Sequence, residues 1–115
     1  MDKYNVMTKS DALIAFIALS QATRLDVFRL LIKAGENGMM AGDISQALAI
    51  KQNTMSANLS ILARTNLVKK KREGRHIRYT ANFAGVRALL QFLMEDCCGG
   101  EEKKCGEVLD AIVCG

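Results

Sequence analysis

Four cysteines lie within the last 19 residues of this 115-residue chain. Cys97 and Cys98 are adjacent, Cys105 follows seven positions later, and Cys114 stands beside the C-terminus. Thiolates bind soft, thiophilic ions and are also the reactive groups of redox chemistry. The first residues do not lead into a secretory leader, and without one clustered thiols favour metal binding or redox sensing over structural disulfides. The sequence therefore predicts a thiol-based sensing site at the C-terminal end.

The spacing of the first three thiols suits a single ion. Cys97, Cys98 and Cys105 fall within nine residues, so closing a loop around one ion costs little entropy. In a continuous helix Cys97 and Cys98 would point about 100° apart. Gly99-Gly100 lets the chain leave the helix there at little steric cost. These three cysteines are the candidate metal ligands.

The charge of the chain is divided unevenly. Residues 1–94 carry 14 Lys/Arg and 6 Asp/Glu, hence +8, whereas residues 95–115 carry 2 Lys and 6 Asp/Glu, hence −4. A basic body suits a polyanionic partner. Half of the residues are hydrophobic and proline is absent, as in a helix-rich single domain. No apolar run is long enough to span a bilayer, so we expect a cytoplasmic protein with no membrane partner.

Hydrophobic periodicity predicts helices over residues 8–20, 21–34, 42–48 and 53–65. Thr8 to Asp11 form a capping pattern before the first helix, and Gly35 to Gly38 end the second. The third is expected to pack inward through Ile44, Ala47 and Leu48. Residues 49–52 make a tight connection to the fourth, which is the layout of a helix-turn-helix unit.

The helix over 53–65 has two different faces. One side gathers Met55, Leu59, Leu62 and Asn66, and the opposite side carries Asn53, Ser56, Ala57, Ser60 and Arg64. The second face has no acid, whereas an ordinary solvated helix face mixes Lys with Glu. Short polar side chains can approach the base edges inside a DNA groove, and a face without acids is not repelled by the phosphates that line the groove. This face is predicted to read DNA.

Residues 67–80 change to a strand-like period. Ile77 and Tyr79 alternate and Gly74 lies at the tip, which predicts a β-hairpin. Against Glu73, its basic residues are Lys69, Lys70, Lys71, Arg72, Arg75 and Arg78, a net charge of +5. A basic hairpin directly after a helix-turn-helix is a wing.

A fifth helix is predicted from an N-cap at Asn82 to Gly99-Gly100. Its apolar residues are Val86, Leu89, Leu90, Phe92, Leu93 and Met94. They cover more of the helix than one face of a small domain needs. The predicted fold is thus mainly α with a β-hairpin wing, a winged helix-turn-helix over residues 1–96 followed by a cysteine-containing tail over 97–115.

Several strings resemble the ArsR/SmtB family of metalloregulatory repressors over about residues 20–80. They are Ala22-Thr23-Arg24-Leu25, Ser56-x-x-Leu59-x-x-Leu62, Asn66-Leu67-Val68 and Arg72-Glu73-Gly74-Arg75 with Tyr79. The resemblance implies a homodimer that joins through its N- and C-terminal helices and binds operator DNA. The chain has Asn58 where the family often has histidine and Asn66 where it often has glycine, which leaves the preferred DNA sequence open.

Two metal sites of that family have no counterpart here. Its arsenic-type site uses Cys-x-Cys on the third helix, but residues 39–44 contain no thiol. Its zinc-type site on the fifth helix needs histidines, and His76 in the hairpin is the only one. The tail instead resembles arsenite repressors whose Cys-Cys and later Cys follow the fifth helix. The resemblance implies As(III), or Sb(III), as effector at Cys97, Cys98 and Cys105, and no organic cofactor.

The sequence thus predicts an arsenite-responsive repressor released from operator DNA when As(III) binds. Base reading is assigned to Gln52, Asn53, Ser56, Asn58 and Ser60, and backbone contacts to Lys51, Arg64, Lys71, Arg72, Arg75 and Arg78. Alternatives are another thiophilic ion (Sb, Cd, Pb, Hg), an organic trivalent arsenical, thiol oxidation, or tail thiols without a function. Cys114 is a spare thiol or a weak fourth ligand.

Other function classes fit the sequence poorly. An enzyme is not expected, because the chain has one histidine, no glycine-rich phosphate loop and no nucleophile–base arrangement. A winged helix that binds only proteins would show acids or apolar groups on its recognition face. Steeply salt-dependent DNA binding would separate that possibility from a DNA-binding regulator.

Overall fold

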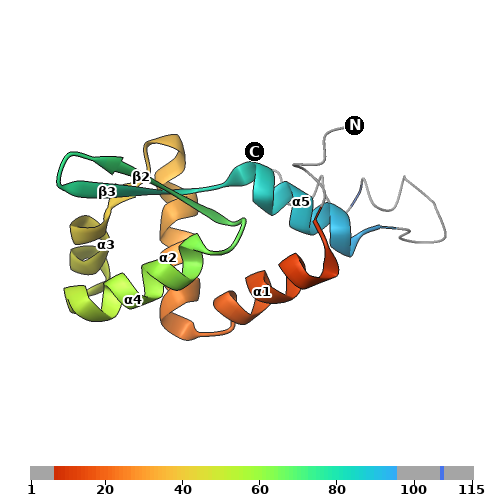
Figure 1. Cartoon of the computed structure of the whole chain (residues 1–115), viewed down its shortest axis with the longest axis horizontal. Coiled ribbons are helices and arrows are strands. Elements are labelled where there is room, and N and C mark those ends of the chain that lie inside the picture. Colours follow the sequence, from red (N-terminus) through yellow and green to blue (C-terminus); the bar gives the residue numbers. More distant parts are fainter. Residues whose placement is uncertain (1–6, 96–106, 108–115) are drawn as a thin grey trace.

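The computed structural model describes residues 7–95 and residue 107. Its elements are α1 (Lys9–Leu19), α2 (Ala22–Ala34), the short 3-10 helix η2 (Gly35–Asn37), β1 (Met39–Met40), α3 (Ala41–Leu48), α4 (Gln52–Ala63), β2 (Val68–Glu73), β3 (His76–Ala81) and α5 (Phe83–Leu93) (Figure 1). This order confirms the predicted mainly helical fold with a hairpin wing. Within the described part, no helix combines the length and apolarity needed to cross a bilayer.

The first two helices begin with side-chain caps. Thr8 Oγ1 accepts a hydrogen bond from the Asp11 amide at 3.0 Å, and the Asp11 carboxylate accepts one from the Thr8 amide at 3.2 Å. This reciprocal pair is the predicted capping box, which satisfies two amides left free by the helix. At α2 the Gln21 side chain accepts from the Arg24 amide at 2.9 Å, a cap that the sequence pattern did not indicate.

Helix α1 buries its small residues and exposes its large ones. Ala12, Ala15 and Ala18 are almost fully buried. The exposed large side chains of α1 are Leu13, Ile14, Phe16 and Ile17, each at least 40% exposed. An ordinary surface helix turns its large apolar residues inward. The apolar outer face of α1 is therefore unpaired within one chain.

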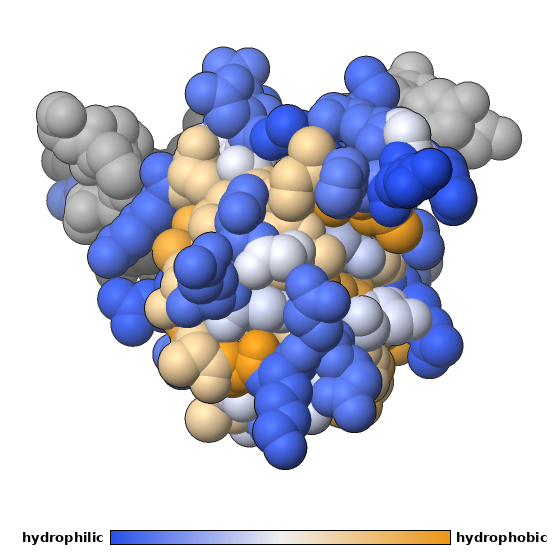
Figure 2. Space-filling model, turned by 90° about the vertical axis from the view of Figure 1, so that its left-hand side faces the viewer, coloured by the Kyte–Doolittle hydropathy of each residue, from blue (hydrophilic) through white to orange (hydrophobic). Residues whose placement is uncertain are grey.

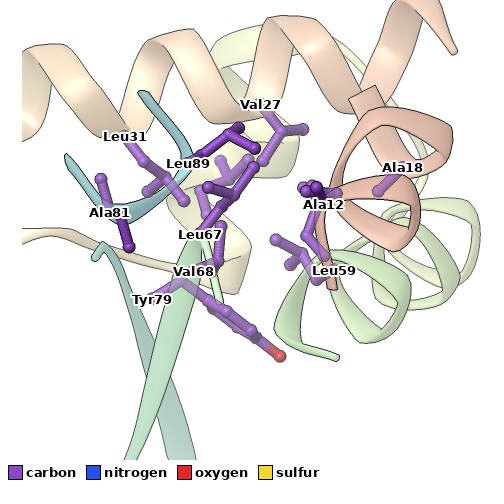
Figure 3. Packing of buried hydrophobic residues seen from close by; sticks show 14 of the residues in the cluster. Ala12, Ala18, Val27, Leu31, Leu59, Leu67, Val68, Tyr79, Ala81 and Leu89 are labelled. Carbon is purple, nitrogen blue, oxygen red and sulfur yellow. The ribbon is translucent and has the colours of Figure 1, made fainter. Parts of the chain in front are cut away.

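The core lies where α2, α3 and α4 meet the sheet and α5. Its largest fully buried side chains are Val27, Leu31, Ile44, Met55, Leu59, Leu62 and Leu67. Figure 3 shows Ala12 and Ala18 of α1 and Leu59 of α4 in one cluster, which Val68 and Tyr79 join from the strands. Side chains from both halves of the helix-turn-helix thus share one core, which fixes α4 relative to the wing.

The sheet has three antiparallel strands in the order β1-β3-β2. In the wing, Glu73 pairs with His76 across the turn Gly74-Arg75. Gly74 has φ +64°, and a positive φ at the first of two turn residues suits a primed hairpin turn. Strand β1 was not predicted, yet Met39 pairs with Tyr79. This pairing ties the wing to the segment that enters α3.

Three local expectations need correction. Ala47 is exposed, and Ser45 takes the buried place beside Ile44. Helix α5 ends at Leu93, short of Gly99-Gly100, with Met94 as its C-cap. Asn82 occupies the N-cap position of α5 but makes no capping bond there. Its Nδ2 instead donates to the Asn66 carbonyl at 2.8 Å, which joins the start of α5 to the turn between α4 and β2.

Candidate nucleic-acid interface

A sharp turn at Ala49 sets the position of α4. Ala49 has φ +54°, a left-handed conformation uncommon for a residue other than glycine. The amide of Ala49 donates to the Gln46 carbonyl at 3.3 Å, and that of Ile50 donates to the Ser45 carbonyl at 3.0 Å. These bonds close α3, and α4 then begins at Gln52. The chain thereby forms the compact two-helix unit that the sequence predicted.

The two faces of α4 are as predicted except at Asn66, which was expected on the inward side but is exposed and follows the end of α4. Met55, Leu59 and Leu62 are at most 1% exposed. The residues of the opposite side, Asn53, Ser56, Ala57, Ser60 and Arg64, are all exposed. Helix α4 contains no acid, and its N-cap residue Lys51 is an exposed cation. The helix therefore offers a polar surface, free of acids, at the positive end of its dipole.

Asn58 does not belong to this exposed surface. Its side chain is 8% exposed, and both ends of its amide are used inside the chain. Oδ1 accepts from Arg24 Nη1 at 3.1 Å, and Nδ2 donates to the Thr54 carbonyl at 3.2 Å. A base edge would have to break these bonds, so we remove Asn58 from the set of base-reading residues.

The wing presents most of its cations to solvent. Lys69, Lys70, Lys71, Arg72 and Arg75 are exposed. Figure 2 views the end of the molecule that carries the wing tip, α3 and the start of α4, and shows hydrophilic side chains over much of it with paler and apolar ones between them. A cluster of exposed cations beside an acid-free helix face is suited to two neighbouring stretches of a phosphate backbone.

Arg78 differs from the other wing cations. Its Nε donates to the Glu73 carboxylate at 3.0 Å, and its Nη1 donates to the Asn37 carbonyl at 2.8 Å. The guanidinium thus links β3 to the turn before β1 and pairs with the acid of the wing. Two of its guanidinium nitrogens are thus engaged within the chain, so we expect Arg78 to hold the wing and not to contact phosphate.

A cavity of about 450 Å³ separates α3 and α4 from the wing. Gln52 and Ser56 line it from α4, and Arg75 and His76 line it from the wing. Met40, Met55 and Tyr79 contribute apolar surface, and burial raises the pKa of Tyr79 above its ordinary value. The cavity thus brings polar side chains of α4 and of the wing, the two predicted DNA-contacting elements, to one place.

The predicted metal ligands Cys97, Cys98 and Cys105 lie outside the described residues, as does Cys114. Within residues 7–95 and 107, no group of three or more His, Cys, Asp and Glu side chains could hold a metal ion. The thiol site therefore remains a prediction from sequence.

A family described as "Helix-turn-helix domain" matches residues 19–71, which span α2 to the middle of β2. No curated protein matches the chain. Among solved structures, an ArsR-like transcriptional regulator from Rhodococcus sp. RHA1 is 21% identical to this chain with a TM-score of 0.65. The match covers 90% of this chain and 93% of the Rhodococcus chain. The chain has the winged helix-turn-helix fold.

Two further solved structures are similar to this chain. HlyU from Vibrio cholerae N16961 is 25% identical with a TM-score of 0.59. The match covers 81% of this chain and 97% of the HlyU chain. A third structure is the homodimeric winged helix-turn-helix DNA-binding domain of Mb0332 from Mycobacterium bovis, described as a possible ArsR-family transcriptional regulator. It is 27% identical with a TM-score of 0.59, and the match covers 76% of this chain and 81% of the Mb0332 chain.

Proposed function

We propose that the chain is a homodimeric repressor of an imperfectly palindromic operator, released when trivalent arsenic binds Cys97, Cys98 and Cys105. The observation that carries the DNA-binding part is the exposed, acid-free face of α4 next to the cationic wing. The effector rests on the chemistry of the tail and on its resemblance to arsenite-responsive repressors.

Helix α1 supports a dimer. Its outer face exposes four large apolar side chains, and on α5 Phe83 and Leu93 are 47% and 52% exposed. Contiguous apolar surface of this kind marks a protein interface more often than solvent contact. The Mycobacterium bovis relative is described as homodimeric. A twofold pair through α1 and α5 would place two copies of α4 on successive major grooves about 34 Å apart.

DNA contacts divide into two classes. Base edges are read by the exposed polar residues of α4, namely Gln52, Asn53, Ser56 and Ser60. Phosphates are held by the exposed cations Lys51, Arg64, Lys71, Arg72 and Arg75. The first class determines which operator is bound, and the second determines affinity and its dependence on salt.

Three thiols suit trivalent arsenic. Binding arsenous acid forms three As–S bonds and breaks three As–O bonds, and the thiol protons leave with the hydroxides as water. Soft thiolates prefer such a centre to hard cations. Cys97 follows α5 closely in sequence, and α5 belongs to the proposed dimer face. A tenfold loss of operator affinity needs only about 1.4 kcal/mol of coupling between the two sites.

The test is operator binding followed by fluorescence anisotropy under reducing conditions. Wild type is titrated separately with arsenite, antimonite, cadmium and zinc, beside Cys97→Ser, Cys98→Ser and Cys105→Ser, with Cys114→Ser as the matched control. Arsenite should release wild type and Cys114→Ser but none of the other three. Release by cadmium alone, or by an oxidant in a separate titration without reductant, would reassign the effector and leave the DNA-binding function standing. Failure of wild type to bind any DNA in a salt-dependent manner would refute that function.

A further inference from the structure

Arg24 joins three helices through its side chain. It lies in the first turn of α2, where its own amide donates to Gln21 Oε1 at 2.9 Å. Its Nε donates to the Ala18 carbonyl in the last turn of α1 at 2.7 Å, and its Nη1 donates to Asn58 Oδ1 in α4 at 3.1 Å. One partly buried guanidinium therefore connects the apolar-faced helix with the predicted recognition helix.

The contact with α1 uses an acceptor that the helix leaves free. The last carbonyls of an α-helix have no partner within it, and a cation there also suits the helix dipole. Ala18 is 1% exposed, so its carbonyl lies next to the core. The bond holds the C-terminal end of α1 at a fixed distance from α2.

The contact with α4 is equally constrained. Asn58 Nδ2 donates to the Thr54 carbonyl in the preceding turn, which orients the amide so that Oδ1 faces Arg24. Asn58 is buried, whereas Ser56 and Ser60 on either side of it in sequence are exposed. Fixing Asn58 therefore fixes the rotation of α4 about its axis, and with it the direction in which the polar face points.

The guanidinium of Arg24 acts as a hydrogen-bond donor to uncharged acceptors. The one ion pair among the described residues joins Arg78 to Glu73, so Arg24 directs its donors to neutral oxygens. Its planar guanidinium holds donors at fixed angles and reaches two acceptors on different helices at once, which the single ammonium of lysine does less well.

We propose that Arg24 is the positioning residue of the recognition helix, which sets α4 against the C-terminal end of α1. This inference rests on the proposed function, because α1 is assigned to the dimer and α4 to DNA. A change in how two α1 helices pack would then reach the DNA-reading face through two hydrogen bonds. Arg24 need not touch DNA for this role.

The test compares Arg24→Gln and Arg24→Lys with Arg29→Gln, which removes the same charge from an exposed position of α2. Arg24→Gln should weaken operator binding about tenfold, Arg24→Lys should restore part of the loss, and Arg29→Gln should stay within twofold of wild type. The slope of log affinity against log salt should stay at the wild-type value. A slope reduced by about 0.9 per protomer, or about 1.8 for the dimer, would mean a lost phosphate contact and would overturn the positioning role.

A double-mutant cycle tests the pair itself. If Arg24 acts through Asn58, adding Asn58→Ala to Arg24→Gln should weaken operator binding by less than twofold more. Full additivity of the two losses would overturn the inference.

Hydrogen exchange gives a readout that needs no DNA. In Arg24→Gln the amides of α4 should exchange faster while those of α5 keep their protection. A uniform loss across the chain would show a general effect on stability and would overturn the positioning role. Local loosening of α4 in a protein whose wild type binds no operator would support the bridge and refute the proposed function.

Discussion

Gly85 in α5 lies directly against the backbone carbonyl of Asn66, so closely that a Cβ at position 85 would overlap the carbonyl oxygen. The same carbonyl accepts a hydrogen bond from Asn82 Nδ2 at 2.8 Å. The turn between α4 and β2 and the start of α5 are thus packed backbone to backbone. This contact fixes where the proposed dimer helix leaves the DNA-binding unit.

Gly85→Ala should therefore destabilise the fold. Alanine normally stabilises a helix over glycine by about 0.5–1 kcal/mol, but here the added methyl has no space and should cost about 1–3 kcal/mol. Gly42→Ala is the matched control, because its Cβ would meet only Gln52 Nε2 at 3.4 Å. Urea unfolding should show opposite signs for the two variants. Equal gains would mean that the backbone contact is looser than described.

Ile17→Glu should convert the proposed dimer to monomers without unfolding the chain. Ile17 is 65% exposed in one chain, so the substitution removes no core contact. In a twofold interface each substitution counts twice, and losing about 1.5 kcal/mol per side raises the dissociation constant roughly 100-fold. Sedimentation velocity measures the fraction of dimer, and Gln46→Glu at an exposed position of α3 is the control. A dimer as tight as wild type would exclude α1 from the interface.

Ser56→Ala should lower affinity for the operator but not for unrelated DNA. Ser56 is exposed on the acid-free face of α4, and loss of a base contact costs about 1–3 kcal/mol. Ser10→Ala makes the same change on the exposed surface of α1. Anisotropy titrations with both DNAs check the result. An unchanged ratio of the two affinities would remove Ser56 from base reading.

Arg75→Gln and Arg78→Gln should differ although both remove a wing cation. Arg75 is exposed, so its loss from both protomers of the proposed dimer should reduce the salt slope of DNA binding by about 1.8, or about 0.9 per protomer. Arg78 is bonded to Glu73 and to the Asn37 carbonyl, so its loss should leave the slope unchanged and cost about 1 kcal/mol of folding stability. Salt titrations and urea unfolding of both variants decide it. The reverse pattern would exchange the two roles.

Tyr79 predicts how stability changes at alkaline pH. Burial raises the pKa of Tyr79 in the folded chain, whereas the unfolded chain keeps the ordinary value of about 10. The neutral phenol therefore contributes stability below pH 10 that is lost as pH rises through the folded-state pKa. Tyr79→Phe should lose less stability than wild type between pH 9.5 and 11, measured by urea midpoints. Parallel curves would mean that Tyr79 does not contribute.

Features fixed by neighbouring residues could be predicted from the sequence. The Thr8–Asp11 capping box, the buried side of α4 and the glycine turn of the wing depend on a few positions close in the chain. Such patterns repeat with the period of the element, so one sequence suffices to find them.

Features that depend on distant partners could not be predicted. Strand β1 has two residues, too few for any periodicity, and forms only because β3 lies beside it. Asn58 sits at the edge of the helical wheel, and only the position of Arg24, 34 residues earlier, shows that it is used internally. In the sequence Arg78 does not differ from the other wing cations. Only its hydrogen bond to the carbonyl of Asn37, 41 residues earlier, distinguishes it from them.

The inverted packing of α1 has a consequence for how this segment can vary. Its alanines face the core, where any larger side chain would push the helix outward. Its large apolar residues face the second protomer of the proposed dimer. Both sides of the helix are therefore restricted, one by size and the other by polarity. Substitution scanning should find α1 less tolerant than α3, although most of its side chains are exposed in one chain. A gene duplicate could diverge into a separate regulator, free of mixed dimers, by changing that outer stripe alone.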